Sequence, residues 1–211
     1  MGYSTDFIGS FTLSRPATVE EKNYLNLFGD TRRMKRDVSK LMEIFKGKHG
    51  NPFAKEKTPE AIYGNDGEYF ALDDGQSGQT ADSSIIDFNT PPGQVNYGDK
   101  RFPDTWMENT RLTKEGICQP GLWCQWMLNN DGTELEWDGS EKFYNYIEWL
   151  KYLIKHFFEP WGIKLNGEVE WEGEDHDDKD KIIVKDNNVK TLIGVTVYKD
   201  DDGNLIPDDN L

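Results

Sequence analysis

Four basic side chains within five positions form the densest positive group in the chain: Arg32, Arg33, Lys35 and Arg36. A guanidinium group can hold a phosphate or carboxylate through two parallel hydrogen bonds, and a lysine adds a compact positive charge. The cluster therefore predicts a site for a phosphorylated, nucleotide-like ligand. Two plainer interpretations stay open: a solvated helix face, or arginines paired with acids of the same chain.

Aromatic side chains could complete such a site. Trp123 and Trp126 lie three positions apart with Gln125 between them, and Tyr69 comes from a distant stretch. Rings of this kind can stack on a base or a sugar, although at these spacings they are also typical core residues. The Gln125 amide needs hydrogen-bond partners, from the protein or from a ligand. The predicted ligand-binding residues are therefore Arg32, Arg33, Lys35, Arg36, Tyr69, Trp123, Gln125 and Trp126.

Catalytic and metal-binding signatures are poor. His49, His156 and His176 are isolated from one another, and Cys118 and Cys124 lack the partner cysteines of a zinc ribbon. No glycine-rich phosphate loop and no nucleophile elbow occur. The acidic runs at 174–180 and 200–204 do not fit a calcium loop, which favours solvated acid. We expect no catalytic residue, no cofactor and no metal.

The charge balance limits the classes of molecule that we expect as binding partners. The chain of 211 residues has 39 acidic and 24 basic side chains, a net charge of −15. Nine basic and five acidic residues lie between Arg15 and Lys48, whereas fourteen acidic and six basic residues follow Gly162. Such a surface repels nucleic acid and anionic membranes and favours basic proteins. Two cysteines, no long apolar run and no signal-peptide profile predict a cytoplasmic protein.

The stretch from Ser140 to Trp161 is the element most able to position these side chains. Its apolar residues recur every three or four positions, which predicts a helix near 140–159 with one broad buried face: Phe143, Tyr146, Ile147, Leu150, Leu153, Ile154, Phe157 and Phe158. Asp138 or Ser140 can cap its start, and Pro160 ends it. We expect this helix to lie across a sheet.

The remaining pattern supplies that sheet. Alternating apolar residues predict strands at 3–13, 122–128, 133–137, 163–172, 181–185 and 189–197, and Thr18 with Glu21 predicts a capped helix that stops at Gly29. A second amphipathic stretch covers 38–45. Between 51 and 119 the periodicity fades into an irregular insertion with short strands expected at 68–72 and 84–88. Its loop at 75–78 could close over the arginine cluster.

This order predicts an α+β fold of ferredoxin-like, split β-α-β type. Both helices would lie on one face of an antiparallel sheet, with the insertion and an extra C-terminal hairpin added. We expect a single domain over residues 1–198, interrupted by the insertion at 51–119, and an acidic tail over 199–211.

Several stretches also carry a resemblance. They are Met1–Phe7, Thr31–Arg36, Gln119–Trp126 (QPGLWCQW), Trp137–Gly139, Glu141–Gly162 (EKFYNYIEWLKYLIKHFFEPWG) and Gly167–Trp171. They resemble an uncharacterised family of proteins from tailed phages and scattered bacteria, over the first 40 residues and residues 118–187. The resemblance implies a phage-type origin and the cytoplasm of an infected bacterium. Small acidic phage proteins of this kind are often inhibitors or sequestering agents aimed at host systems.

Three functions follow, in this order. The first is a non-enzymatic phage-type binding protein, acting in counter-defence or host takeover, that sequesters a phosphorylated nucleotide-like ligand. The second is an acidic nucleic-acid mimic that docks on a basic host or defence protein. The third is an enzyme that acts on a phosphorylated substrate.

Overall fold

The computed structural model describes residues 5–72, 79–96, 100–101, 104–174, 179–194, 197–199, 202 and 204–207. The loop at 75–78, most of the acidic run at 174–180 and much of the tail lie outside these residues. The expected α+β class is confirmed: a six-stranded antiparallel sheet has the order β4-β5-β1-β6-β7-β8. Its strands are β1 (Thr5–Leu13), β4 (Trp126–Leu128), β5 (Glu134–Trp137), β6 (Leu165–Gly173), β7 (Lys179–Lys185) and β8 (Asn188–Ile193).

The central strand β1 shows why the sheet has this register. Phe7, Phe11 and Leu13 alternate onto the buried face, as the sequence predicts. Gly9 lies opposite Val169 of β6 at φ +111°, and a side chain there would meet the Glu168 carbonyl oxygen at 2.5 Å. Glycine at this position therefore allows β1 and β6 to approach along their full length.

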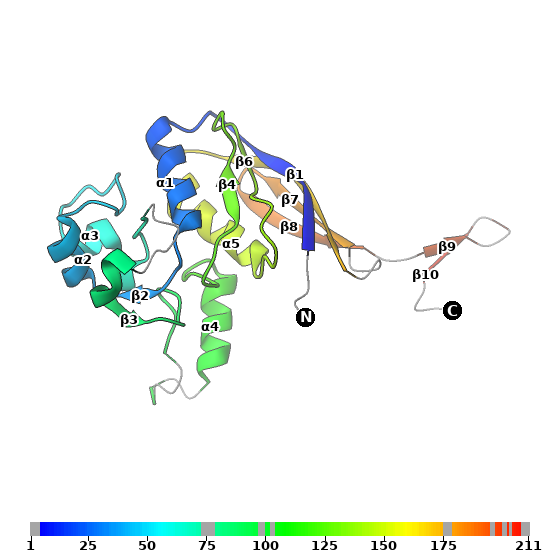
Figure 1. Cartoon of the computed structure of the whole chain (residues 1–211). Helices are drawn as coiled ribbons and strands as arrows, with labels where there is room; N and C mark the ends of the chain where they lie inside the picture. Colours follow the sequence, from blue (N-terminus) through cyan, green and yellow to red (C-terminus); the bar gives the residue numbers. More distant parts are fainter. Residues whose placement is uncertain are drawn as a thin grey trace.

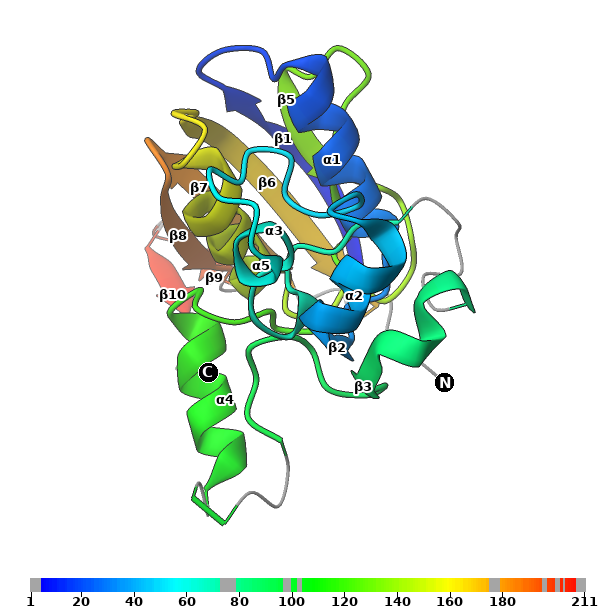
Figure 2. The same ribbon diagram turned by 90° about the vertical axis from the view of Figure 1, so that its left-hand side faces the viewer.

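Two helices cover one face of the sheet (Figures 1 and 2). The first, α1 (Val19–Asp30), begins with the predicted capping box of Thr18 and Glu21. The second, α5 (Tyr146–Leu153), continues as a π-helical turn over Ile154–Phe158. Leu150, Ile154 and Phe157 are buried, as expected.

The predicted start of the long helix at residue 140 is wrong. Lys142 and Asn145 adopt left-handed backbone conformations, at φ +64° and +56°, so residues 140–145 cannot continue a right-handed helix. Asp138 accepts a hydrogen bond from the Ser140 amide in a local turn instead of capping α5. Phe143 is nevertheless buried in the main core, because the turn folds it inward.

The insertion is more regular than the sequence indicates. It contains α3 (Pro59–Tyr63), the short strand β3 (Ile85–Asp87) and α4 (Thr105–Lys114), and β3 pairs with β2 (Lys35–Arg36). The strand expected at 84–88 is thus confirmed. The strand expected at 68–72 is wrong, because the Tyr69 and Phe70 amides donate to Tyr63 and Gly67 in turns. The helix α4 was not predicted, since few apolar residues recur at helical spacing there.

The insertion elements α3 and β3 lie on the outer side of the two covering helices, together with α2 (Val38–Phe45), whereas α4 projects at the bottom of the view (Figure 1). A second apolar core joins α2, α3 and the segment that follows α3, and it is made of Leu41, Ile62, Tyr63, Phe70 and Leu72. After β8 the chain forms a small ribbon of β9 (Val197–Lys199) and β10 (Leu205–Pro207). Within the described residues, no helix is long and apolar enough to cross a membrane.

Candidate functional site

The arginine segment, residues 31–36, follows α1 directly and lies beneath the insertion. The Thr31 hydroxyl donates to the Leu27 carbonyl at 2.7 Å and accepts from the Leu72 amide at 2.9 Å. The Arg33 amide donates to the Leu122 carbonyl at 2.9 Å. These bonds fix residues 31–33 between the insertion and the irregular segment before β4, with the Arg33 side chain in the protein interior.

Arg33 is a structural side chain. It is 1% exposed. Its guanidinium donates to the carbonyls of Phe70 at 2.6 Å and Glu68 at 2.8 Å, and to the Gln119 side-chain oxygen at 3.0 Å. The same group lies 4.0 Å from the centre of the Phe28 ring. Burial lowers the pKa of Arg33 to about 10, so the group still carries its charge at pH 7.

Arg36 and Lys35 have similar internal roles. Arg36 is also 1% exposed; it donates to the Ser84 hydroxyl at 3.1 Å and lies over the Phe70 ring. The Lys35 ammonium lies 3.3 Å from the Asp66 carboxylate. Arg32 differs, because it is only partly buried and stacks on the half-exposed Phe88 ring at 4.1 Å.

The expectation that the arginine cluster faces open space is therefore wrong for Arg33 and Arg36. Carbonyls of the insertion and the Phe28 ring surround the Arg33 guanidinium, and the Ser84 hydroxyl and the Phe70 ring contact that of Arg36. A ligand phosphate cannot reach either group in this structure. The physical reason is that a folded insertion leaves carbonyl oxygens that need donors in the interior. Arginine, with five N–H donors, satisfies several of them at once.

Tyr69 belongs to a polar network beside Arg33. Its hydroxyl lies 3.1 Å from His156 Nδ1, and His156 Nε2 lies 3.1 Å from the Gly116 carbonyl oxygen. The Gln119 amide donates to the Glu68 carbonyl at 2.7 Å and to the Tyr152 hydroxyl at 3.1 Å. The network joins the insertion to α5 and its π-helical turn, and none of the cavities described below opens onto it.

Trp123 and Gln125 lie elsewhere, at a hollow of about 490 Å³. The end of α1, the segment before β4 and the turn after β5 line it: Gly29, Asp30, Trp123, Cys124, Gln125, Asp138, Ser140 and Glu141. Gly29 lets α1 approach this segment, since a side chain there would lie 3.1 Å from the Cys124 carbonyl oxygen. The volume falls in the usual range for small-molecule and side-chain sites.

Gln125 holds the walls of this hollow together. Its amide nitrogen donates to the Glu141 carbonyl at 3.0 Å, and its side-chain oxygen accepts from the Trp137 indole at 3.1 Å. Its backbone carbonyl accepts from the Asp138 amide at 3.0 Å. The amide thus finds its partners within the protein, and its role is to position the loop that carries Asp138 and Glu141.

The chemistry of the hollow favours a cation. Trp123 is 44% exposed, and three of the eight lining residues are acidic while none is basic. The carbonyl end of α1 adds partial negative charge at Gly29 and Asp30. In the described part of the chain no three His, Cys, Asp or Glu side chains are grouped closely enough for a metal ion. An aromatic face with carboxylates around it suits an ammonium or guanidinium group.

The hollow offers little for covalent chemistry. Cys124 is buried, and burial raises the pKa of its thiol to about 12, which keeps it protonated and unreactive. No histidine is among the lining residues. The bases nearest to Ser140 in this set are carboxylates, and Asp138 already accepts a hydrogen bond from the Ser140 amide.

Trp126 is a core residue. It is buried between Phe7, Phe11 and Phe143, and its indole donates to the Tyr146 carbonyl at 2.9 Å. The eight predicted residues are therefore not brought together. Arg33 and Tyr69 meet at the insertion junction, Trp123 and Gln125 line the hollow, and Arg32 stacks at the surface.

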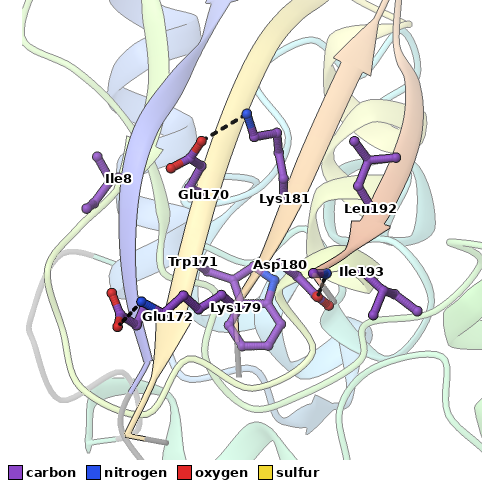
Figure 3. Close-up of a pocket in the computed structure, with 10 residues that line it drawn as sticks. Ile8, Glu170, Trp171, Glu172, Lys179, Asp180, Lys181, Leu192 and Ile193 are labelled. Atoms are coloured by element: carbon purple, nitrogen blue, oxygen red, sulfur yellow. Dashed lines mark hydrogen bonds and ion pairs between the residues drawn. The ribbon is translucent and has the colours of Figure 1, made fainter. Parts of the chain in front are cut away.

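A second cavity, of about 380 Å³, lies at one end of strands β6, β7 and β8 (Figure 3). Two of its three acids pair with lysines: Glu170 lies 2.9 Å from the Lys181 ammonium, and Glu172 lies 2.8 Å from that of Lys179. The lining of this cavity thus includes two lysines, whereas the lining of the Trp123 hollow includes no basic residue.

The sequence contained part of the signal for the hollow. Asp138 and Glu141 lie in the polar run between a predicted strand and a predicted helix, where side chains of a loop gather on a rigid scaffold. Asp30 gives no such signal, because only the packing of α1 on the 122–125 segment brings it near them.

No family model, no curated protein and no solved structure matches this chain. The site is therefore interpreted from its own geometry.

Proposed function

We propose that the protein is a non-enzymatic docking protein whose Trp123 hollow receives a basic side chain of a partner protein. The observation that carries the proposal is the lining of the hollow: one exposed tryptophan, three carboxylates and no basic residue. Such a surface attracts lysine or arginine and repels phosphate. The protonated Cys124 thiol and the lack of a lining histidine support binding without turnover.

This proposal develops the acidic-mimic function that the sequence placed second. The first function, sequestration of a phosphorylated nucleotide-like ligand, has less support, because Arg33 and Arg36 are buried and do not face a ligand. Its remaining support is Arg32, stacked on Phe88 at the edge of the insertion. Nucleotides therefore belong among the ligands tested.

The wider setting is also a proposal. The phage-type motifs support a role in counter-defence or host takeover in the bacterial cytoplasm, with a basic host or defence protein as the target. We further propose that the core is ferredoxin-like. The strand order β6-β1-β5-β4, with α1 leading from β1 toward β4 and α5 from β5 toward β6, supports that topology.

Titration calorimetry on the whole protein tests the docking function. The probes are an octa-arginine amide, an octa-glutamate peptide of the same length and ATP. We expect binding of the arginine peptide alone. Trp123→Ala should weaken it at least about tenfold, because the cation–π contact is lost. The charge-neutral double variant Asp138→Asn, Glu141→Gln should weaken it to a similar extent.

A matched control separates the hollow from general attraction to an acidic protein. The double variant Glu168→Gln, Glu170→Gln removes the same number of negative charges, but from the sheet face, where both acids pair with Lys181. It should leave affinity within about threefold of the wild type. Equal losses in the two double variants, or tight binding of ATP, would contradict the proposal.

A further inference from the structure

The junction between the insertion and α5 contains an acid and a base in close contact. Glu68 comes from the insertion and His156 from the π-helical turn, and the Glu68 carboxyl lies 3.9 Å from His156 Nδ1. Their side chains are 14% and 16% exposed. Helical turns of the π type often mark functional positions, and here the turn directs an imidazole at a carboxyl group.

The hydrogen bonds assign the histidine tautomer. Nε2 faces the Gly116 carbonyl oxygen at 3.1 Å, so it carries the ring hydrogen. Nδ1 is then an acceptor, and the Tyr69 hydroxyl donates to it at 3.1 Å. The imidazole also stacks on the Tyr152 ring at 4.1 Å, which fixes its plane. The closed junction thus holds a neutral imidazole with both nitrogens used.

Burial shifts the pKa values of Glu68 and His156 in opposite directions. Removal from water, the largest cause, raises the pKa of Glu68 from 4.5 to about 7. The same cause lowers the pKa of His156 from 6.5 to about 4. Between pH 4.5 and 6.5 the closed junction contains a protonated carboxyl and a neutral imidazole, whereas the opened groups would form a carboxylate and an imidazolium.

We propose that Glu68 and His156 form a proton-conserving pair: when the junction opens, the carboxyl O–H bond breaks and an N–H bond forms at Nδ1 of His156. The number of bound protons stays the same, so acidity alone does not open the junction. The insertion would remain closed over α5 across a mildly acidic range. This inference is independent of the docking function.

Other charged and titratable groups face the pair from every packed element. They are Arg33 before β2, Asp66 and Tyr69 in the insertion, Cys118 in the segment after α4, Tyr24 in α1, and Tyr152 and Lys155 in α5 and its continuation. Burial raises the pKa values of the three tyrosines and of Cys118, so these groups stay protonated over the range considered. Arg33 stays charged throughout.

The contributions of Glu68 and His156 to the stability of the closed state depend on pH with opposite signs, which gives a test. Glu68 stabilises the closed state below pH 4.5, and this contribution is lost as the pH rises to about 7. His156 stabilises the closed state above pH 6.5, and this contribution is lost as the pH falls to about 4. Between pH 4.5 and 6.5 the two slopes are equal and opposite.

Hydrogen exchange of the Leu72 amide, which joins the insertion to the Thr31 hydroxyl after α1, measures opening of the insertion when it is divided by the intrinsic exchange rate. In the wild type the opening constant should change less than about threefold between pH 4.5 and 6.5. In Glu68→Gln it should fall about tenfold per pH unit as the pH rises. In His156→Gln, which keeps a donor for Gly116, it should rise about tenfold per unit.

Glu60→Gln is the matched control, because it makes the same change at an exposed position of the insertion. It should keep the flat wild-type profile. Slopes of one sign in both junction variants, or flat profiles in both, would overturn the inference. If either variant fails to fold, nuclear magnetic resonance titration of wild-type Glu68 and His156 decides. A carboxylate and an imidazolium at pH 6 would then refute the proposal.

Discussion

The buried contacts of Arg33 with the insertion form an arginine junction. This junction and the Trp123 hollow handle charge in opposite ways. At the junction Arg33 is buried among backbone carbonyls, and its charge organises the insertion. In the hollow the acids surround open space beside an exposed tryptophan. The density of charge along a sequence therefore does not indicate whether the charge faces a ligand. In a protein of net charge −15, three of the four clustered basic residues are buried: Arg33, Lys35 and Arg36.

The largest expected effect falls on the junction. Arg33→Ala should lower the free energy of unfolding by about 3–5 kcal/mol, because the buried carbonyls of Glu68 and Phe70 lose their donors. Denaturant unfolding provides the measurement. Its neighbour Arg32 serves as control, and Arg32→Ala should cost about 1 kcal/mol or less. Equal costs would remove the distinction between the two arginines.

A substitution in the hydrophobic core gives a reference for the cost of Arg33→Ala. Leu150 is fully buried on α5 against the sheet, and Leu150→Ala should cost about 2–5 kcal/mol. Arg33 should thus rank with a core leucine when both are measured by the same denaturant method. A cost below about 1 kcal/mol for Leu150→Ala would contradict the packing of α5.

Glu21 is a buried acid that forms an ion pair with Arg15, whereas the lining of the hollow contains no basic residue. It accepts two hydrogen bonds from Arg15 and completes the α1 capping box, and these contacts lower its pKa. Glu21→Gln should cost about 1–2 kcal/mol at pH 7. This loss should shrink as the pH falls below 4.5, because the stabilisation by the carboxylate is present above its unfolded pKa. A loss that does not depend on pH would indicate packing alone.

The smallest effect on stability is expected at the hollow. Trp123→Ala should change the free energy of unfolding by less than about 1 kcal/mol, because the ring is substantially exposed and fills no core space. The same change should abolish most binding of the arginine peptide. If thermal unfolding shifts as much as in Leu150→Ala, Trp123 is a structural residue and the contrast between the two regions fails.

The sequence predicted the sheet and its helices well, because alternation and helical spacing reflect burial directly. Strand β1, the capping box at Thr18 and the apolar face with Leu150 all follow from local pattern. The first turns of the long helix were mispredicted, since the left-handed residues Lys142 and Asn145 carry no apolar signal. The α4 helix was missed for a similar reason.

The site was less predictable, because it depends on contacts between distant segments. Gln125 was singled out correctly as an amide that needs partners, but those partners lie in the 137–141 turn. Arg33 is a clear case of a charged side chain whose environment only the folded insertion defines. Glu68 and His156 are 88 positions apart and meet through the π-helical turn, which spacing along the chain does not reveal.

The central claim is that the hollow, and not the arginine junction, meets the ligand. The most direct test follows the indole N–H resonance of Trp123 in the whole protein, labelled with nitrogen-15, during titration with the octa-arginine amide and, separately, with ATP. We expect the Trp123 signal to move in a saturable way with the arginine peptide and to stay in place with ATP. A saturable shift with ATP, or arginine-peptide binding that leaves Trp123 unmoved, would contradict the account.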